Sequence, residues 1–242
     1  MAVDDCFAHP RLAAIYDHLE PDRGDLDAYV RLVDEFGARR VLDIGCGTGV
    51  FALRLAGRGV DVIGVDPARA SIDVARAKRG SERVRWIHGE ATDLPPLRAD
   101  LATMTGNVAQ AIAEPSAWRG TLRAVHAALR PGRRLAFESR DPAARAWEEW
   151  TPENSYRETR IPGAGVVESW VELIEASLPL VTFRRTYRFA TDGQVLTSES
   201  TLRFREREEI EQDLGAHGYL VDDIRDAPDR PGKEFVLLAR RP

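Results

Sequence analysis

Three glycines at alternate positions, Gly45, Gly47 and Gly49, separate an apolar run from a stretch with apolar residues at helical spacing. The apolar run, residues 41–44, predicts a strand buried on both faces, and residues 51–56 predict a helix packed against the same sheet. A glycine backbone can turn tightly and approach a ligand closely. The exposed amides at the start of the following helix favour an anion. The sequence therefore predicts a ligand-binding turn between the strand and the helix.

An aspartate closes the next predicted strand, residues 60–66. Pro67 follows it at the favoured first position of a helix over 68–78. The carboxyl ends of parallel strands form the edge where ligands bind in open α/β sheets, and a carboxylate there can accept hydrogen bonds from both hydroxyls of a ribose. Asp66 is therefore a candidate for ribose binding. The alternative is that Asp66 only caps the helix that follows it.

Two interpretations of the glycine turn compete. The spacing Gly47-x-Gly49-x-x-Ala52, with Asp66 at about 20 residues, satisfies the loose dinucleotide fingerprint and would make the chain an NAD(P)-dependent oxidoreductase. Asp43 and Gly45 extend the pattern to Asp-x-Gly-x-Gly-x-Gly. With these residues the chain resembles the class I S-adenosylmethionine-dependent methyltransferases. The resemblance implies S-adenosylmethionine as cofactor, S-adenosylhomocysteine as product, and an α/β fold with a Rossmann-like, seven-stranded, mostly parallel sheet whose last strand is antiparallel.

The resemblance also implies a set of residues around the cofactor. Asp43 and the glycine turn would face its amino-acid end, a tyrosine of an N-terminal helical cap its methionine part, and the segment after the third strand its adenine. Glu90 departs from the family's commoner aspartate, so either Glu90 or Thr92 is expected to meet the adenine. Tyr16 has an alternative role as the polar edge of a packed helix. The cofactor-binding candidates are Tyr16, Asp43, Gly45, Cys46, Gly47, Gly49, Asp66, Pro67, Glu90, Ala91, Thr92, Thr105 and Asn107.

Candidates for binding the acceptor follow the fourth and fifth predicted strands. The loop 105–110 is expected beside the methionine end of the cofactor, and its amide side chains could position an acceptor. Arg140 could hold a carboxylate or phosphate, or could instead pair with a neighbouring acid. No side chain stands out as a general base, with Glu138 and His18 as weak candidates, which favours an amine or an acidic hydroxyl as acceptor. The acceptor candidates are Asn107, Gln110, Glu138, Arg140, Trp147 and Trp150.

Composition limits the partners and the compartment. The chain has 242 residues and a net charge of -5, so we expect a small-molecule acceptor and no nucleic acid. Its two cysteines, Cys6 and Cys46, lack metal-ligand spacing, so we expect no bound metal. The absence of a long apolar run or a secretory signal favours a cytoplasmic protein without membrane contact, either a monomer or a homodimer. A cofactor-binding protein without catalysis is a further alternative.

The periodicity of the chain predicts three parts that would position these residues. Residues 1–36 form an N-terminal cap of two helices, and 37–141 with 206–242 form the cofactor-binding domain. From residue 142 the alternation of strands and helices stops. Alternating apolar residues over 166–175, 180–190 and 195–205 predict an antiparallel lid within 142–205, which would exclude water and shape the acceptor pocket. In the large domain, the remaining expected strands are 84–88, 99–104, 134–140, 219–227 and 232–241, and the remaining helices are 118–129 and 206–217.

Overall fold

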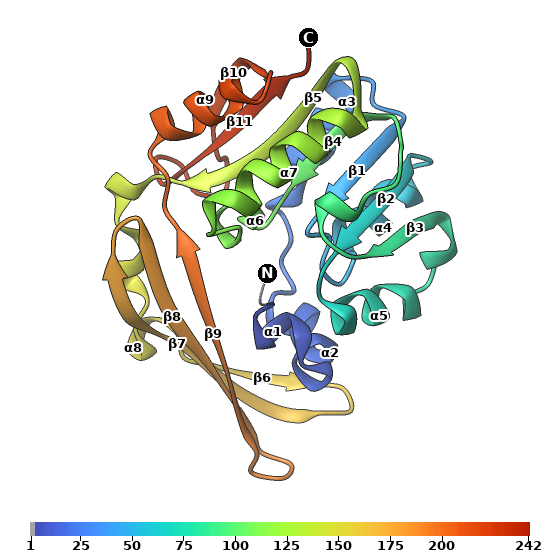
Figure 1. Ribbon diagram of the computed structural model, residues 1–242. Coiled ribbons are helices and arrows are strands. Elements are labelled where there is room, and N and C mark those ends of the chain that lie inside the picture. The colour runs from blue at the N-terminus through green and yellow to red at the C-terminus, as the bar shows by residue number, and fades with distance from the viewer. Residues whose placement is uncertain (1–2) are drawn as a thin grey trace.

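The computed structural model describes residues 3–242 and contains a seven-stranded sheet and a separate four-stranded sheet (Figure 1). The strand order of the large sheet is β3-β2-β1-β4-β5-β11-β10. Strands β1 to β5 pair in parallel, β11 runs antiparallel to β5, and β10 and β11 form an antiparallel pair. This confirms the predicted fold class, including its antiparallel end. The strands are β1 (Arg40–Ile44), β2 (Asp61–Asp66), β3 (Val84–His88), β4 (Ala99–Met104), β5 (Leu129–Arg140), β10 (Leu220–Asp226) and β11 (Glu234–Arg240).

Each face of the large sheet has its own hydrophobic core. In β1, Leu42 and Ile44 belong to one core and Val41 to the other, as expected for side chains that alternate across a strand. Helices α7 (Pro115–Ala128) and α9 (Arg207–Ala216) contribute to the first core, and α3 (Leu26–Glu35) and α4 (Val50–Gly57) to the second. This double burial explains why the central strands read as continuous apolar runs. The shorter helices along this domain are α5 (Arg69–Ala77), α6 (Val108–Ala111), η1 (Ser81–Arg83) and η2 (Ala91–Asp93).

Strand β5 starts earlier than the predicted strand over 134–140. Leu129 already pairs with Ala99, and the register then shifts before Arg134 pairs with Leu101. Pro131 and Gly132 therefore form an irregular stretch between the two paired segments, although their types suggested the end of an element.

The insertion between β5 and α9 is an antiparallel sheet of four strands in sequence order, β6-β7-β8-β9. The prediction of an antiparallel sheet inserted after the fifth parallel strand is confirmed, but it named three strands. The missed strand has the sequence Arg-Glu-Thr-Arg-Ile and lacks the apolar alternation that marked the other three. The elements of the insertion are η3 (Pro142–Ala144), η4 (Ala146–Glu149), α8 (Pro152–Ser155), β6 (Arg157–Ile161), β7 (Gly165–Ser177), β8 (Leu180–Phe189) and β9 (Val195–Arg203).

The N-terminal segment has three helices where two were expected, because the single turn α1 (Asp5–Ala8) precedes α2 (Pro10–Leu19). These two helices lie between the small sheet and α5 (Figure 1), whereas α3 is part of a large-sheet core. Leu12 and Ile15 of α2 pack with Tyr187 and Phe189 of β8. Helices α1 and α2 and the small sheet therefore form one layer, which we call the roof.

No helix within residues 3–242 is both long and apolar enough to cross a membrane. The same residues contain no group of three or more His, Cys, Asp or Glu side chains that could hold a metal ion.

Candidate functional site

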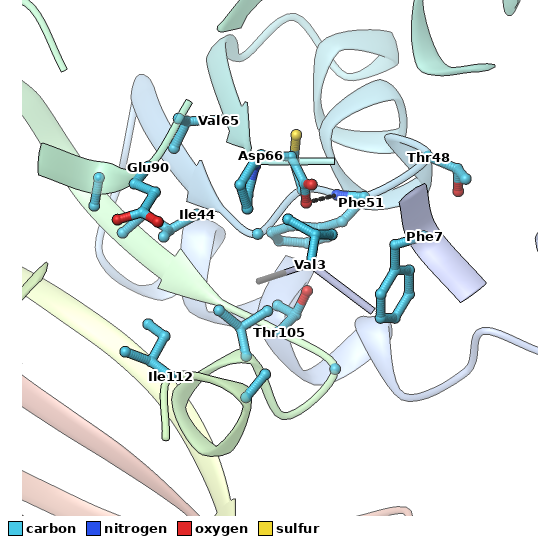
Figure 2. Close-up of a pocket in the computed structure, with 18 of the residues that line it drawn as sticks. Val3, Phe7, Ile44, Thr48, Phe51, Val65, Asp66, Glu90, Thr105 and Ile112 are labelled. Carbon is cyan, nitrogen blue, oxygen red and sulfur yellow. Dashed lines mark hydrogen bonds between the residues drawn. The ribbon is translucent and has the colours of Figure 1, made fainter. Parts of the chain in front are cut away.

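A cavity lies at the carboxyl ends of β1, β2 and β4, between this edge of the large sheet and the N-terminal residues of the roof (Figure 2). Its walls come from the glycine turn after β1, the ends of β2 and β3, the loop after β4, and residues 3–23. Nine of the predicted cofactor-binding residues line it, which are Tyr16, Gly45, Cys46, Gly47, Asp66, Pro67, Glu90, Ala91 and Thr105. The topology thus brings together segments that the sequence separates by tens of residues.

The three glycines of the turn have different physical roles, although all have positive φ angles. A Cβ added to Gly47 would meet no described atom within 4 Å, so this position borders open space. A Cβ on Gly45 would lie 2.4 Å from a methyl group of Val108, and one on Gly49 would lie 2.5 Å from the ring of Trp86. Gly47 therefore keeps the cavity open, whereas the other two permit close packing. Gly49 is a packing residue and is not among the cavity-lining residues of 3–242.

Asp43 lies beneath the turn, with only 1% of its surface exposed. Its Oδ1 accepts a hydrogen bond of 3.2 Å from the Thr103 hydroxyl, and its Oδ2 has no hydrogen-bond partner among residues 3–242. Burial raises the pKa of Asp43 to about 7, and the nearby Arg23 acts in the opposite direction. A buried carboxylate oxygen without a donor is costly. Asp43 is not among the cavity-lining residues of 3–242, so its carboxylate lies behind the glycine turn. From there a carboxylate favours a cationic group bound at the turn, such as the ammonium at the amino-acid end of S-adenosylmethionine.

Asp66 faces the cavity from the end of β2 (Figure 2). Its Oδ2 accepts from the backbone N–H of Gly47 at 2.8 Å, and its Oδ1 accepts from the N–H of Ala68 at 2.7 Å. The capping role that was the alternative to ribose binding is not observed, because α5 begins at Arg69 with Ala68 as its N-cap and has no side-chain capping bond. Each carboxylate oxygen of Asp66 also has a second lone pair available. Burial raises the pKa of Asp66, and the two N–H donors partly offset this. The two amides hold the carboxylate in one orientation toward the cavity.

The segment after β3 supplies the other end of the cavity. Glu90 and Ala91 line it, and Glu90 forms a reciprocal capping pair with Asp93 at the start of η2. The Glu90 N–H donates to Asp93 Oδ2 at 2.8 Å. Thr92 is instead directed at α7, where a Cβ on Gly120 would lie 3.3 Å from its methyl group. Of the two candidates for meeting an adenine, the one on the cavity wall is therefore Glu90.

The roof covers the cavity through its N-terminal residues. Tyr16 of α2 lines the cavity and packs on Phe7, with 5.3 Å between ring centroids. Asp17, on the next position of α2, accepts a 2.5 Å hydrogen bond from the Thr48 hydroxyl of the glycine turn and pairs with Lys78. Lys78 also donates to the Thr48 carbonyl at 2.6 Å. This three-residue contact fastens α2 to the turn.

Several cavity residues escaped the sequence analysis, among them Asp4, Phe7, Thr48 and Arg23. Arg23 lies in the loop before α3, where its guanidinium makes hydrogen bonds of 3.0 and 2.9 Å to the carboxylate of Asp25. In the sequence, the Pro, Gly and Asp residues around Arg23 predict only a break between two helices. A charged side chain in such a loop carries no motif, so only the tertiary structure brings it to the cavity.

Some of the predicted acceptor-binding residues lie behind the cavity, in a buried network under the loop after β4. Glu138 accepts from the Tyr29 hydroxyl at 2.7 Å and from the N–H of Asn107 at 2.9 Å. Asn107 has a φ of 63°, a left-handed conformation that is uncommon for a residue other than glycine. Burial raises the pKa of Glu138. Glu138 therefore holds the loop that carries Thr105, and neither Glu138 nor Asn107 is among the cavity-lining residues of 3–242.

Arg140 belongs to the same network. Its Nε lies 3.3 Å from Glu234 Oε1, and its Nη1 donates to Gln110 Oε1 at 3.2 Å. The alternative that Arg140 pairs with an acid is thus the one observed, with Glu234 of β11 as the acid. Burial lowers the pKa of Arg140 to about 10. Within the described chain, neither Arg140 nor Gln110 borders the cavity.

The two tryptophans predicted as acceptor-pocket walls pack inside the insertion. Trp147 is 4% exposed and meets Phe204 edge to face, with 4.7 Å between ring centroids. Trp150 packs on Phe183 at 4.8 Å. Over residues 3–242 neither ring borders the cavity, because both are used to bury the aromatic face of the lid. The weak base candidate His18 is exposed on α2 and also lies outside the cavity lining described.

Comparison with known proteins finds a family match over the segment that carries the glycine turn. Residues 41–132 match the family model described as "Methyltransferase domain". Among curated proteins, the chain is similar to the cypemycin N-terminal methyltransferase of Streptomyces sp., with 35% identity over 126 residues. That match covers 52% of this chain and 51% of the relative, so it spans about half the length of each.

Solved structures extend the likeness to almost the whole chain. The CcbJ methyltransferase of Streptomyces caelestis is similar with a TM-score of 0.75 and 19% identity, over 94% of this chain and 96% of that one. An amino pentose methyltransferase of Micromonospora echinaspora, solved with S-adenosylmethionine bound, has a TM-score of 0.69 and 21% identity, over 94% and 97% of the two chains. At these identities the likeness shows the fold, including the insertion after β5.

Proposed function

We propose that this chain is a class I S-adenosylmethionine-dependent methyltransferase that transfers a methyl group to a nitrogen or oxygen of a small molecule. Its motif, domain match and fold support the proposal. The observation that carries the proposal is the combination of Asp43 and Gly47. Asp43 has a buried carboxylate oxygen without a partner among residues 3–242, and Gly47, in the turn that follows it, borders open space in the cavity. A dinucleotide-dependent oxidoreductase is not supported, because the sheet ends in the antiparallel pair and the matched domain is a methyltransferase domain.

Each part of the cavity has a proposed role in holding S-adenosylmethionine. Asp43 and the glycine turn receive the amino-acid end, with Arg23 close enough to interact with its carboxylate. Asp66 accepts from the ribose hydroxyls with the lone pairs that the backbone amides leave available. Glu90 and the Ala91 backbone lie at the adenine end. Tyr16 and Thr105 border the region between this site and the acceptor.

When bound, S-adenosylmethionine supplies a methyl group that its sulfonium already makes electrophilic. The protein then has to align the acceptor behind that methyl group and keep water away, and a strong base is optional. The apolar side chains of Val3, Phe7, Phe51, Val108 and Ile112 line the cavity and support this exclusion of water. We therefore propose in-line displacement that depends mainly on proximity and desolvation.

The test begins with calorimetric titration of S-adenosylmethionine, S-adenosylhomocysteine and NADH into the protein. We expect both sulfur nucleosides to bind, and NADH not to bind. A labelled methyl donor with panels of amines, phenols and carboxylic acids then tests transfer. Binding of NADH alone would refute the proposal. Tight binding of S-adenosylmethionine without transfer to any panel would instead indicate a binding protein without catalysis.

A further inference from the structure

The cavity has a carboxylate on its roof side that none of the proposed cofactor contacts uses. Asp4 lines the cavity from the residue directly before α1. An aspartate in this position normally accepts from an N–H of the first helical turn. In the chain from residue 3 onward, the Asp4 side chain makes no such capping bond, and the nearby hydroxyl of Ser200 on β9 lowers the pKa of its carboxyl. The carboxylate therefore lies beside the lid and is not engaged by its own helix.

The other acids of the cavity are occupied differently. Three carboxylates line it within the described residues, those of Asp4, Asp66 and Glu90. Two backbone N–H groups of the large domain hold Asp66, and Glu90 caps η2. Of these three described carboxylates, Asp4 is the one on the roof side, outside the segments after β2 and β3 that carry Asp66 and Glu90. It is the acid best placed to serve the second substrate.

Within residues 3–242, Ser200 is the group that stabilises the negative charge of Asp4, and no cation does so. Its neighbours in the sequence along the cavity wall are the apolar Val3 and Phe7, and Figure 2 shows Val3 between Phe51 and Thr105. Burial raises the pKa of Asp4, and the adjacent Asp5 raises it further, against the opposing effect of Ser200. A partly desolvated carboxylate gains most from a cationic donor, since charge-assisted hydrogen bonds are the strongest available. An anionic acceptor would be repelled.

We propose that Asp4 anchors the amino group of the acceptor, and that the acceptor is a small primary or secondary amine. This inference rests on the proposed methyl transfer. The amine binds as its ammonium, hydrogen-bonded to the Asp4 carboxylate. One ammonium proton then passes through this carboxylate to solvent, and the lone pair left on nitrogen forms the N–CH₃ bond as the S–CH₃ bond breaks and its electron pair goes to sulfur. The methylated nitrogen carries the positive charge, and the product leaves as an ammonium. Ser200 orients the carboxylate.

The experiment uses protein saturated with S-adenosylhomocysteine and two matched probe pairs, 2-phenylethylamine with 2-phenylethanol and cyclohexylamine with cyclohexanol. Binding is measured by ligand-observed NMR and by thermal shift. We expect each amine to bind at least about tenfold more tightly than its alcohol, because only the amine offers a charged donor. D4N should abolish this preference. S200A should weaken it by a smaller factor, because the carboxylate remains but is less well oriented.

D5N is the matched control, because Asp5 is the exposed neighbour on the same helical turn and is not among the described cavity-lining residues. It should bind the amines within about twofold of the wild type, a difference small in free energy. Circular dichroism and an unchanged affinity for S-adenosylhomocysteine establish that D4N is folded with its nucleotide site intact. Amines that bind no better than alcohols, or a preference that survives in D4N, would overturn the assignment of Asp4. Binding of S-adenosylhomocysteine to the wild type is measured first. If it does not bind, the result counts against the proposed function itself.

Discussion

The floor and the roof of the cavity are held together in different ways. On the floor, formed by the loops at the edge of the large sheet, segments close in the sequence fix one another, as where the Gly47 N–H donates to the Asp66 carboxylate 19 residues later. In the roof, the N–H of Cys6 donates to Ser198 Oγ at 2.9 Å across 192 residues of chain, and Arg11 pairs with Asp192 at 2.7 Å. Contacts between segments close in the sequence leave a recognisable motif, whereas contacts across almost the whole chain leave none. The difference teaches that the proposed cofactor end can be recognised from sequence and the proposed acceptor end cannot.

The largest effect should come from blocking the floor. Gly47→Val places a side chain in the open space beside the turn, and we expect affinity for S-adenosylmethionine to fall at least about a hundredfold. Gly59→Val is the matched control, because Gly59 also has a positive φ and open space around it but lies outside the cavity lining described. Calorimetry measures the affinity and far-ultraviolet circular dichroism the fold. Equal losses in both variants would mean that backbone strain, and not the blocked space, is responsible.

The next effect concerns the support behind the floor. Glu138→Gln removes the charge that accepts from Tyr29 and from the N–H of Asn107, and should lower the free energy of unfolding by about 2 kcal/mol. Affinity for S-adenosylmethionine should fall as well, because the loop carrying Thr105 loses its anchor. Urea denaturation measures the first change. Glu158→Gln, at an exposed position of β6, is the control and should change neither quantity. An unaltered unfolding curve for Glu138→Gln would show that the network does not hold the loop.

The third prediction concerns the pH dependence of the floor. Burial raises the pKa of Asp43 to about 7, so in the free protein this carboxyl is mostly protonated below that pH. Its contribution to stability is therefore complete below its unfolded pKa and is lost as pH rises toward 7. A bound ammonium requires the ionised form, so affinity for S-adenosylmethionine should rise about tenfold from pH 5.5 to 7, where an α-amino group stays protonated. Asp43→Asn should make the profile flat, and a slope that persists in this variant would point to another group.

The smallest effect should come from loosening the roof. Arg11 lies with its guanidinium 3.6 Å from the ring centroid of Phe189 and pairs with Asp192. Arg11→Ala should cost about 1 kcal/mol of stability, because both contacts are partly solvated. We expect a few-fold rise in KM for the acceptor and no change in affinity for S-adenosylhomocysteine. Arg207→Ala, which removes an exposed pair on α9, is the control. An equal effect on the nucleoside would contradict the separation of roof and floor.

Much of the fold could be predicted, because it depends on patterns that extend over a few residues. The parallel strands are buried on both faces and are therefore apolar, and the ends of the sheet follow from the order of elements. The prediction missed β6, whose exposed side chains are polar, and it placed α3 in the cap, although its apolar face packs in the large-sheet core. In both cases the tertiary environment, and not the local pattern, determines the structure.

Of the candidate site, only the floor, formed by the loops at the edge of the large sheet, could be predicted from the sequence. Nine predicted residues line the cavity. Most of them could be predicted because glycines and acids at the ends of strands are recognisable from their residue types and positions. Asn107, Gln110, Glu138 and Arg140 lie together in the buried network behind the cavity. Whether these side chains face inward or toward the cavity could not be predicted, because it depends on partners such as Glu234 that lie far along the chain. Arg23 and Asp4 were missed because nothing in their own neighbourhood distinguishes them.

The attachment of α2 has a kinetic consequence. This helix is joined to the glycine turn through Asp17, Thr48 and Lys78, and it packs against β8 on its other side. Under the proposed function, we therefore expect that a displacement of α2 wide enough to release S-adenosylhomocysteine also loosens the contact of α2 with β8 beside the methylated product. A variant that lowers this barrier should shorten the residence times of both products and speed their binding equally, so that their equilibrium affinities stay the same.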